Sequence, residues 1–215
     1  MSRHRILVSI ATVGILSFAG GCQRSPSRRT IPYKPDQPIA ARLLPGDKEV
    51  LIQMEQPDRK LGAAVSESDD QEIDRLRRSQ IIVLVRVATA TGDIADRATM
   101  VRTRVDGQID SLVKGPNGKP LGPSIEFAFD GGTAKLGDVV VTTGTFPRFT
   151  EGEQYLVFLR VQPGTASSLV WGGIAFRVDA QGVLQRVSIG DGGEQSFRTN
   201  LVGKNVSEVI EALER

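Results

Sequence analysis

From residue 81 onward, apolar residues occur in short runs that are separated by turn-forming residues. The first run, IIVLVRVAT at 81–89, is rich in β-branched residues and continuously apolar, which is typical of a strand buried on both faces. A second run apolar on both faces, EQYLVFLRV, lies at 153–161. Other runs with strand character lie at 99–105, 124–130, 138–145, 172–179 and 182–189. Short strands at this spacing predict a mostly β domain that folds as a compact barrel or sandwich.

Helical patterns flank this β region on both sides. Residues 69–79 follow a candidate N-cap, Ser66 or Ser68, and carry acidic residues in the first turn and basic residues in the last. This charge order complements the helix dipole. At the other end, Asn205 and Glu208 have capping-box spacing, and an apolar stripe at helical spacing follows: Val206, Val209, Ile210 and Leu213. We therefore predict an N-terminal flanking helix and a short C-terminal helix that packs one face on the β domain.

The first 21 residues have the pattern of an export signal. Two arginines near the start precede mostly apolar residues at 6–18, and the small residues Ala19, Gly20 and Gly21 follow. A bilayer-spanning helix needs roughly 20 apolar residues, so this run is too short to span. Residues 1–21 are therefore predicted to be a secretory signal peptide.

The stretch AGGC at 19–22 resembles the lipobox of bacterial lipoprotein signal peptides, with Ala19 where that family usually has leucine. The resemblance implies that a diacylglyceryl group is joined to Cys22 and that cleavage makes this residue the new N-terminus. It also implies an anchored protein on the cell membrane or outer membrane, facing outside the cytoplasm. The alternative is an ordinary signal peptide cleaved near Ala19, which leaves Cys22 as a free thiol. Cys22 is the only cysteine, and an unpaired exposed thiol is unusual in an oxidising compartment.

Proline is concentrated directly after the signal peptide. Six of the eleven prolines lie between residues 23 and 57, and this density disfavours helix and sheet alike. We therefore predict an extended tether over 22–65 that lifts a domain at 66–215 off the bilayer. The stretch KEVLIQM at 48–54 interrupts it, and we interpret it as a short edge strand, with a linear binding motif as the alternative.

The composition of the chain limits the kinds of partner, catalytic site and metal site that it can have. Removal of residues 1–21 takes away two arginines and the only histidine, which leaves a mature chain without net formal charge. A neutral chain lacks the lysine and arginine excess that drives nucleic-acid binding. Without histidine or a free cysteine, Ser-His-Asp and Cys-His catalytic sites and His/Cys metal sites are excluded. We therefore expect no nucleic-acid partner, no metal and no cofactor.

Several stretches after residue 75 resemble known exported domains. In order they are SLVKG, a glycine pair at 131–132, FPRFTEGEQYLVFL and GGIAFRVDAQG, and together they resemble a family of bacterial exported domains of unassigned function over about 75–213. That resemblance implies no catalytic residue. The GEQYLVFL stretch is also similar, more weakly, to netrin-type modules and the tissue inhibitors of metalloproteases, which implies a small OB-like barrel. Those inhibitors depend on disulfides and on an N-terminal cysteine that contacts zinc, and this chain has no disulfide.

Three residues are candidates for ligand contact. Asp130 and Asp191 stand in the glycine-rich turns FDGG and DGGEQ, which can seat a cation on the carboxylate or an anion on glycine N–H groups. Ordinary acidic turns are the alternative. Trp171 precedes two glycines and is a candidate for stacking on a ligand at the mouth of a barrel, with a core cap as the alternative.

The leading functional hypothesis is a non-catalytic binding or adaptor module, anchored to the membrane through Cys22, with an envelope protein as its candidate partner. One rival is an envelope hydrolase that uses carboxylates around Asp130, Asp191 and Glu194. The other is a protease-inhibitor-like module, by analogy to the netrin-type proteins.

Overall fold

The computed structural model describes residues 28–53, 68–94, 97–116, 121–143, 146–161, 170–187 and 199–215, without the side chains of 170–172. The predicted signal peptide, Cys22, Asp191 and Glu194 lie outside the described residues.

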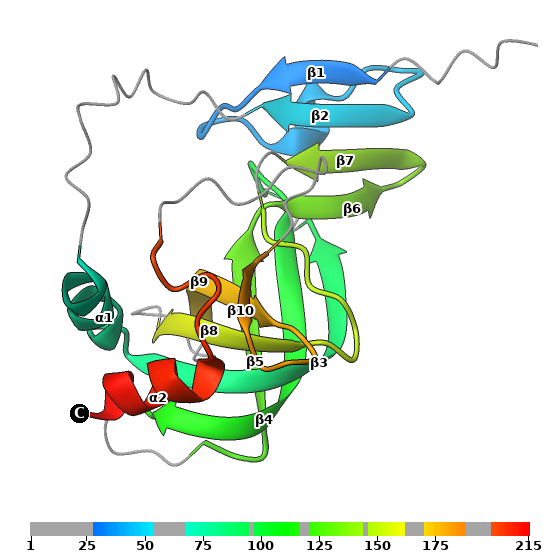
Figure 1. Ribbon diagram of the computed structural model, residues 1–215. Helices are drawn as coiled ribbons and strands as arrows, with labels where there is room; N and C mark the ends of the chain where they lie inside the picture. Colours follow the sequence, from blue (N-terminus) through cyan, green and yellow to red (C-terminus); the bar gives the residue numbers. More distant parts are fainter. Residues whose placement is uncertain are drawn as a thin grey trace, which may run out of the picture.

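Six strands form the larger sheet, in the order β10-β9-β5-β4-β3-β8 (Figure 1). Their bounds are β3 Ile81–Asp93, β4 Arg102–Lys114, β5 Ser124–Asp130, β8 Gln154–Val161, β9 Val170–Val178 and β10 Leu184–Arg186. β9 also pairs with β8, so β3, β4, β5, β9 and β8 are arranged in a ring, although not in a closed barrel. In the described part of the chain, the β5–β9 link is parallel and only two residue pairs long, whereas β8 and β9 pair at eight positions. The ring of strands therefore has few paired residues between β5 and β9.

Two helices flank these strands, α1 (Asp69–Arg77) before them and α2 (Val206–Glu214) after them. The prediction of a mostly β fold with two flanking helices is confirmed. The N-cap of α1 is Ser68, whose hydroxyl accepts from the Gln71 N–H while the Gln71 side chain accepts from the Ser68 N–H. In α2 the Asn205 side chain accepts from the Ser207 N–H at 2.9 Å.

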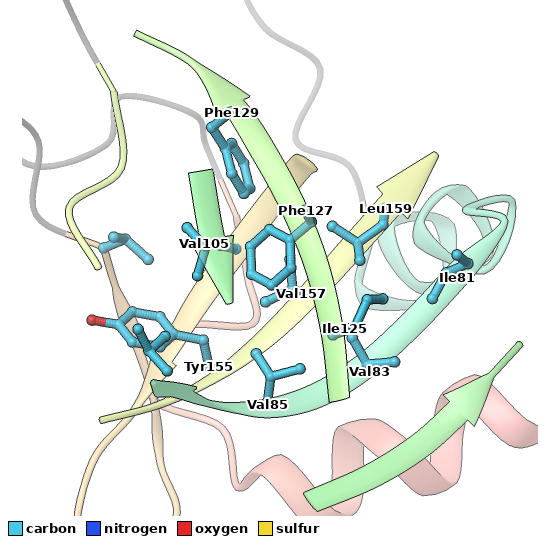
Figure 2. Packing of buried hydrophobic residues seen from close by; sticks show 13 residues of the cluster. Ile81, Val83, Val85, Val105, Ile125, Phe127, Phe129, Tyr155, Val157 and Leu159 are labelled. Atoms are coloured by element: carbon cyan, nitrogen blue, oxygen red, sulfur yellow. The ribbon is translucent and has the colours of Figure 1, made fainter. Parts of the chain in front are cut away.

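Side chains fill the interior of the ring. Alternate residues of β3, β5 and β8 point to this side, because side chains along a strand alternate between its faces. Figure 2 shows residues of these strands, together with Val105 of β4, pointing toward one another; among them are Phe127 and Tyr155, which are 0% and 1% exposed. Phe149 packs between them, with ring centroids 5.8 Å from Phe127 and 4.9 Å from Tyr155. The ring therefore encloses a packed core of aliphatic and aromatic residues.

The opposite face of β3 and β8 is covered as well. Ile82 of β3 and Leu156 and Phe158 of β8 pack against apolar residues of α1 and α2, including Leu76 and Val209. This cover explains the two continuously apolar runs in the sequence, since each strand faces the ring interior on one side and the helices on the other.

The predicted tether is wrong for residues 28–53, which are folded. β1 (Arg29–Pro32) pairs in parallel with β2 (Glu49–Gln53), and a 3-10 helix, η1 (Ile39–Arg42), connects them. β2 pairs in parallel with β7 (Val139–Thr143), which is joined to β6 (Gly132–Leu136) in an antiparallel hairpin. The result is a second, four-stranded sheet in the order β1-β2-β7-β6, at the end of the molecule away from α2 (Figure 1).

Burial explains why this segment folds despite its prolines. Ile39 and Ile52 are fully buried, and with Ile31 and Val50 they pack on Val101, Ala134 and Val141 of the β domain. The prolines stand where a missing N–H is tolerated: Pro32 ends β1, Pro38 precedes η1, and Pro35 and Pro45 lie in turns. The predicted strand at 48–54 is confirmed as β2, but β2 lies between β1 and β7 and is not an edge.

Candidate functional site

Three charged residues lie side by side across β3, β4 and β5. Strand register pairs Asp93 with Arg102 and Arg102 with Asp130. Partners directly opposite in a sheet share a face, and neighbouring strands lie about 4.8 Å apart, so an arginine stands between two aspartates. Phe127 and Phe129 of β5 face the ring interior, and Asp130 is therefore on the outer face.

This row lines a cavity of about 260 Å³ together with the loop that leads into β4. The lining residues are Asp93, Arg97, Ala98, Thr99, Met100, Arg102 and Asp130. Drug-sized ligand pockets span roughly 300–1,000 Å³, so this hollow suits a small polar group or one side chain of a partner.

Backbone hydrogen bonds hold the wall of the cavity in place. The Ala98 carbonyl accepts from the N–H of Ile39 at 2.9 Å, which ties the loop to η1. The Val101 N–H donates to the Thr143 hydroxyl at 3.0 Å, and the Val101 carbonyl accepts from Gly131 at 2.7 Å. The folded N-terminal segment, which the sequence predicted as a tether, is thus part of the support for this site.

The charges around the cavity balance one another. Asp93 and Asp130 supply two carboxylates, and Arg97 and Arg102 supply two guanidinium groups. Burial raises the pKa of Asp130 above its ordinary value, and the nearby positive charge of Arg102 offsets part of that rise. A raised pKa favours the protonated carboxyl, which can donate a hydrogen bond as well as accept one.

Beyond the cavity, the same face carries exposed ion pairs. The Arg104 guanidinium lies 3.5 Å from the Asp93 carboxylate and 3.1 Å from that of Glu126. Arg86 lies 3.2 Å from Asp110. Exposed pairs of this kind add little stability, and they leave the outer face polar and mixed in charge.

The structure places two of the predicted contact residues on neighbouring strands. Asp130 ends β5 and lines the cavity, and Trp171 of β9 pairs with Ala128, two residues before Asp130. The Trp171 side chain, Asp191 and Glu194 lie outside the described residues. The sequence analysis missed Asp93, Arg97 and Arg102, because only strand register brings residues so far apart in the chain to one row.

The two chemistries predicted for FDGG find little support at this turn. The Gly131 N–H donates to the Val101 carbonyl, so it is not available to an anion. In the part of the chain that the structure describes, no three His, Cys, Asp or Glu side chains converge as metal ligands. At this turn a cation would also have to compete with Arg102 for Asp130.

No helix among the described residues is long and apolar enough to cross a bilayer. Comparison of the chain with protein-family models and with curated proteins finds no match.

Proposed function

We propose that this protein is a lipid-anchored, non-catalytic binding module of the cell envelope. Cys22 carries the anchor, and the cavity beside Asp130 makes the contact with a ligand or partner. The anchor is supported by the export signal and by the resemblance of AGGC to a lipobox.

One observation carries the non-catalytic assignment. The ring interior is filled, and on the outer face the carboxylates of Asp93, at the cavity, and of Asp110 and Glu126, beyond it, lie 3.1–3.5 Å from arginine guanidinium groups. A carboxylate paired with a guanidinium group has its hydrogen-bonding capacity taken up by that ion pair, which suits recognition better than proton transfer. Asp130 has the hollow beside it, and a hydrogen-bonding group of a ligand can reach it there.

The position of the cavity agrees with an OB-like barrel. Such barrels have five strands, are partly open, and bind ligands on the face of their second and third strands and on the loop between the first two. The counterparts here are β4, β5 and the loop between β3 and β4, which together line the cavity. Fold analogy supports the site but does not identify the ligand.

The test of the anchor is the intact mass of the protein from membranes, compared with a Cys22→Ser variant. We expect a chain that starts at residue 22 with a diacylglyceryl increment, absent from the variant. An unmodified chain that starts near Ala19 would overturn the anchor.

The non-catalytic assignment is tested against the hydrolase. The raised pKa of Asp130 is the one observation that favours a hydrolase, since a general acid must keep its proton near neutral pH. We expect the purified mature chain to leave envelope glycans, peptides and phosphate esters unchanged. Turnover that disappears in Asp130→Asn would replace the binding module with the enzyme. Slowed cleavage by a metalloprotease would instead support the protease-inhibitor-like module.

A further inference from the structure

We propose that the turn between η1 and β2, residues 43–48, docks on an anionic bilayer and inserts Leu44 at the boundary of headgroups and acyl chains. The proposal rests on the proposed anchor at Cys22 for its orientation. In this orientation the end of the four-stranded sheet at which β1 and β2 begin faces the membrane.

The length of chain between the anchor and the fold sets the distance. Arg29, the first residue of β1, is seven residues after Cys22, so it lies within roughly 25 Å of the lipidated residue even if the chain is fully extended. A tether over 22–65 would have allowed a reach of about 150 Å. The folded segment therefore keeps this end of the protein near the surface of the bilayer.

Hydrogen bonds place the turn at the same end as the anchor. The Arg29 guanidinium donates to both oxygens of the Asp47 carboxylate, at 2.9 and 2.6 Å, and to the Arg42 carbonyl at 2.9 Å. Asp47 also accepts from the Leu44 N–H at 2.8 Å. The turn is thus fastened to the first residue of β1, and Figure 1 shows that β1 and β2 begin at the same end of their sheet.

The exposed surface of the turn is apolar at its tip. Among the described residues, two large hydrophobic side chains are exposed: Leu44, at 57%, and Leu112, at 44%. Pro45 and Gly46 beside Leu44 are exposed too, and neither carries a charge. The acidic residue of the turn, Asp47, is already paired with Arg29, so it does not repel anionic lipid as a free carboxylate would.

Charge is divided unevenly between this segment and the rest of the mature chain. Residues 22–53 carry six basic and three acidic residues, a net charge of +3, and residues 54–215 carry a net charge of −3. Anionic headgroups attract basic segments near the surface and repel acidic ones. An apolar tip with basic surroundings is the combination that binds at a membrane interface. The attraction of the basic segment to anionic headgroups and the insertion of the apolar tip therefore favour the same orientation, with residues 43–48 toward the lipid.

The first experiment uses the mature chain from residue 22 with Cys22→Ser, so that lipidation plays no part. We measure its binding to vesicles of phosphatidylcholine with about 30% phosphatidylglycerol, a fraction chosen to give the vesicles an anionic surface. Leu44→Ser is expected to lower binding about tenfold, the effect of removing most of one leucine from the interface. Leu112→Ser is the matched control and should bind as the parent does, with the same thermal midpoint for all three proteins. Equal binding by the two leucine variants would overturn the proposal.

The second experiment uses the lipid-anchored protein. Leu44→Cys, labelled with a polarity-sensitive fluorophore, should show blue-shifted emission and quenching by quencher-bearing lipids, while Leu112→Cys should show neither. Identical emission at both positions would overturn the docking turn even if mass spectrometry shows a lipid on Cys22. A mass without lipid would overturn the anchor, and the vesicle experiment would still decide the turn.

Discussion

The folded N-terminal segment is tested most directly by Ile39→Ala. The Ile39 side chain is fully buried between the segment and the β domain, beside Val101 and Val141. The substitution removes three carbons, worth about 0.8 kcal/mol each in transfer free energy, and leaves a cavity. Measured losses for isoleucine to alanine in cores are about 2–5 kcal/mol, and we expect a value in this range. A tether would have shown a change within about 0.5 kcal/mol.

Two measurements separate loss of the segment from loss of the whole fold. Hydrogen exchange at the Tyr33 amide, which donates to the Gln53 carbonyl at 2.8 Å, reports opening of the β1–β2 pair. Urea unfolding reports the global free energy. In Ile39→Ala the Tyr33 amide should exchange faster than in the parent by at least about tenfold, since 1.4 kcal/mol is a factor of ten. Leu44→Ala, an exposed change in the same segment, should leave both measurements unchanged. Unaltered exchange and unfolding in Ile39→Ala would refute the packing of this segment.

Three further substitutions test other parts of the fold. Gly132 has a φ of +136°, and a Cβ there would lie 2.3 Å from the Thr103 hydroxyl oxygen. Gly132→Ala should therefore lower the free energy of unfolding in urea by more than about 1 kcal/mol. The loss should also be larger than for Gly137→Ala, because nothing lies within 4 Å of a Cβ at that position. Arg77 donates to two carbonyls at the C-terminus of α2, at 2.6 and 3.2 Å, so Arg77→Met should lower the free energy of unfolding by about 1–3 kcal/mol. Because burial raises the pKa of Asp130 above that of the unfolded chain, ionised Asp130 opposes folding, and Asp130→Asn should be more stable than the parent at pH 7. That advantage should disappear as the pH falls below about 3.9, where the aspartate is protonated in both states.

Local signals in the sequence were sufficient for both helices and for most of the strands after residue 68, whereas β6 (Gly132–Leu136) and the second half of β4 were not predicted. The cap at Ser68 and the stripe through Val209 depend on residues within one helical turn, and both elements lie where the sequence predicts them. The runs at 81–89 and 153–161 are apolar on both faces because each strand is covered on both faces, a property that the sequence shows directly.

The N-terminal sheet could not be predicted in the same way. Its apolar residues, such as Ile31 and Ile39, lie singly among prolines and polar residues, without the period of a strand or a helix. They are buried only because β7 offers an edge to β2 and the β domain offers Val101 and Val141. The row of Asp93, Arg102 and Asp130 could not be predicted for a similar reason. It depends on register between strands far apart in sequence.

The η1 helix connects the two proposed surfaces. It begins with Ile39, whose N–H holds the Ala98 carbonyl on the wall of the cavity, and it ends with Arg42, whose carbonyl is bonded to Arg29 beside the docking turn. Because both ends of η1 are held by these hydrogen bonds, we expect the proposed docking of the turn to restrain this wall of the cavity as well. Ile39→Ala should therefore disturb both sites at once, whereas Leu44→Ser should weaken lipid binding and leave the loop at Ala98 in place. If hydrogen exchange along residues 97–101 changed equally in the two variants, the effect would come from the turn itself and not from the packing of Ile39.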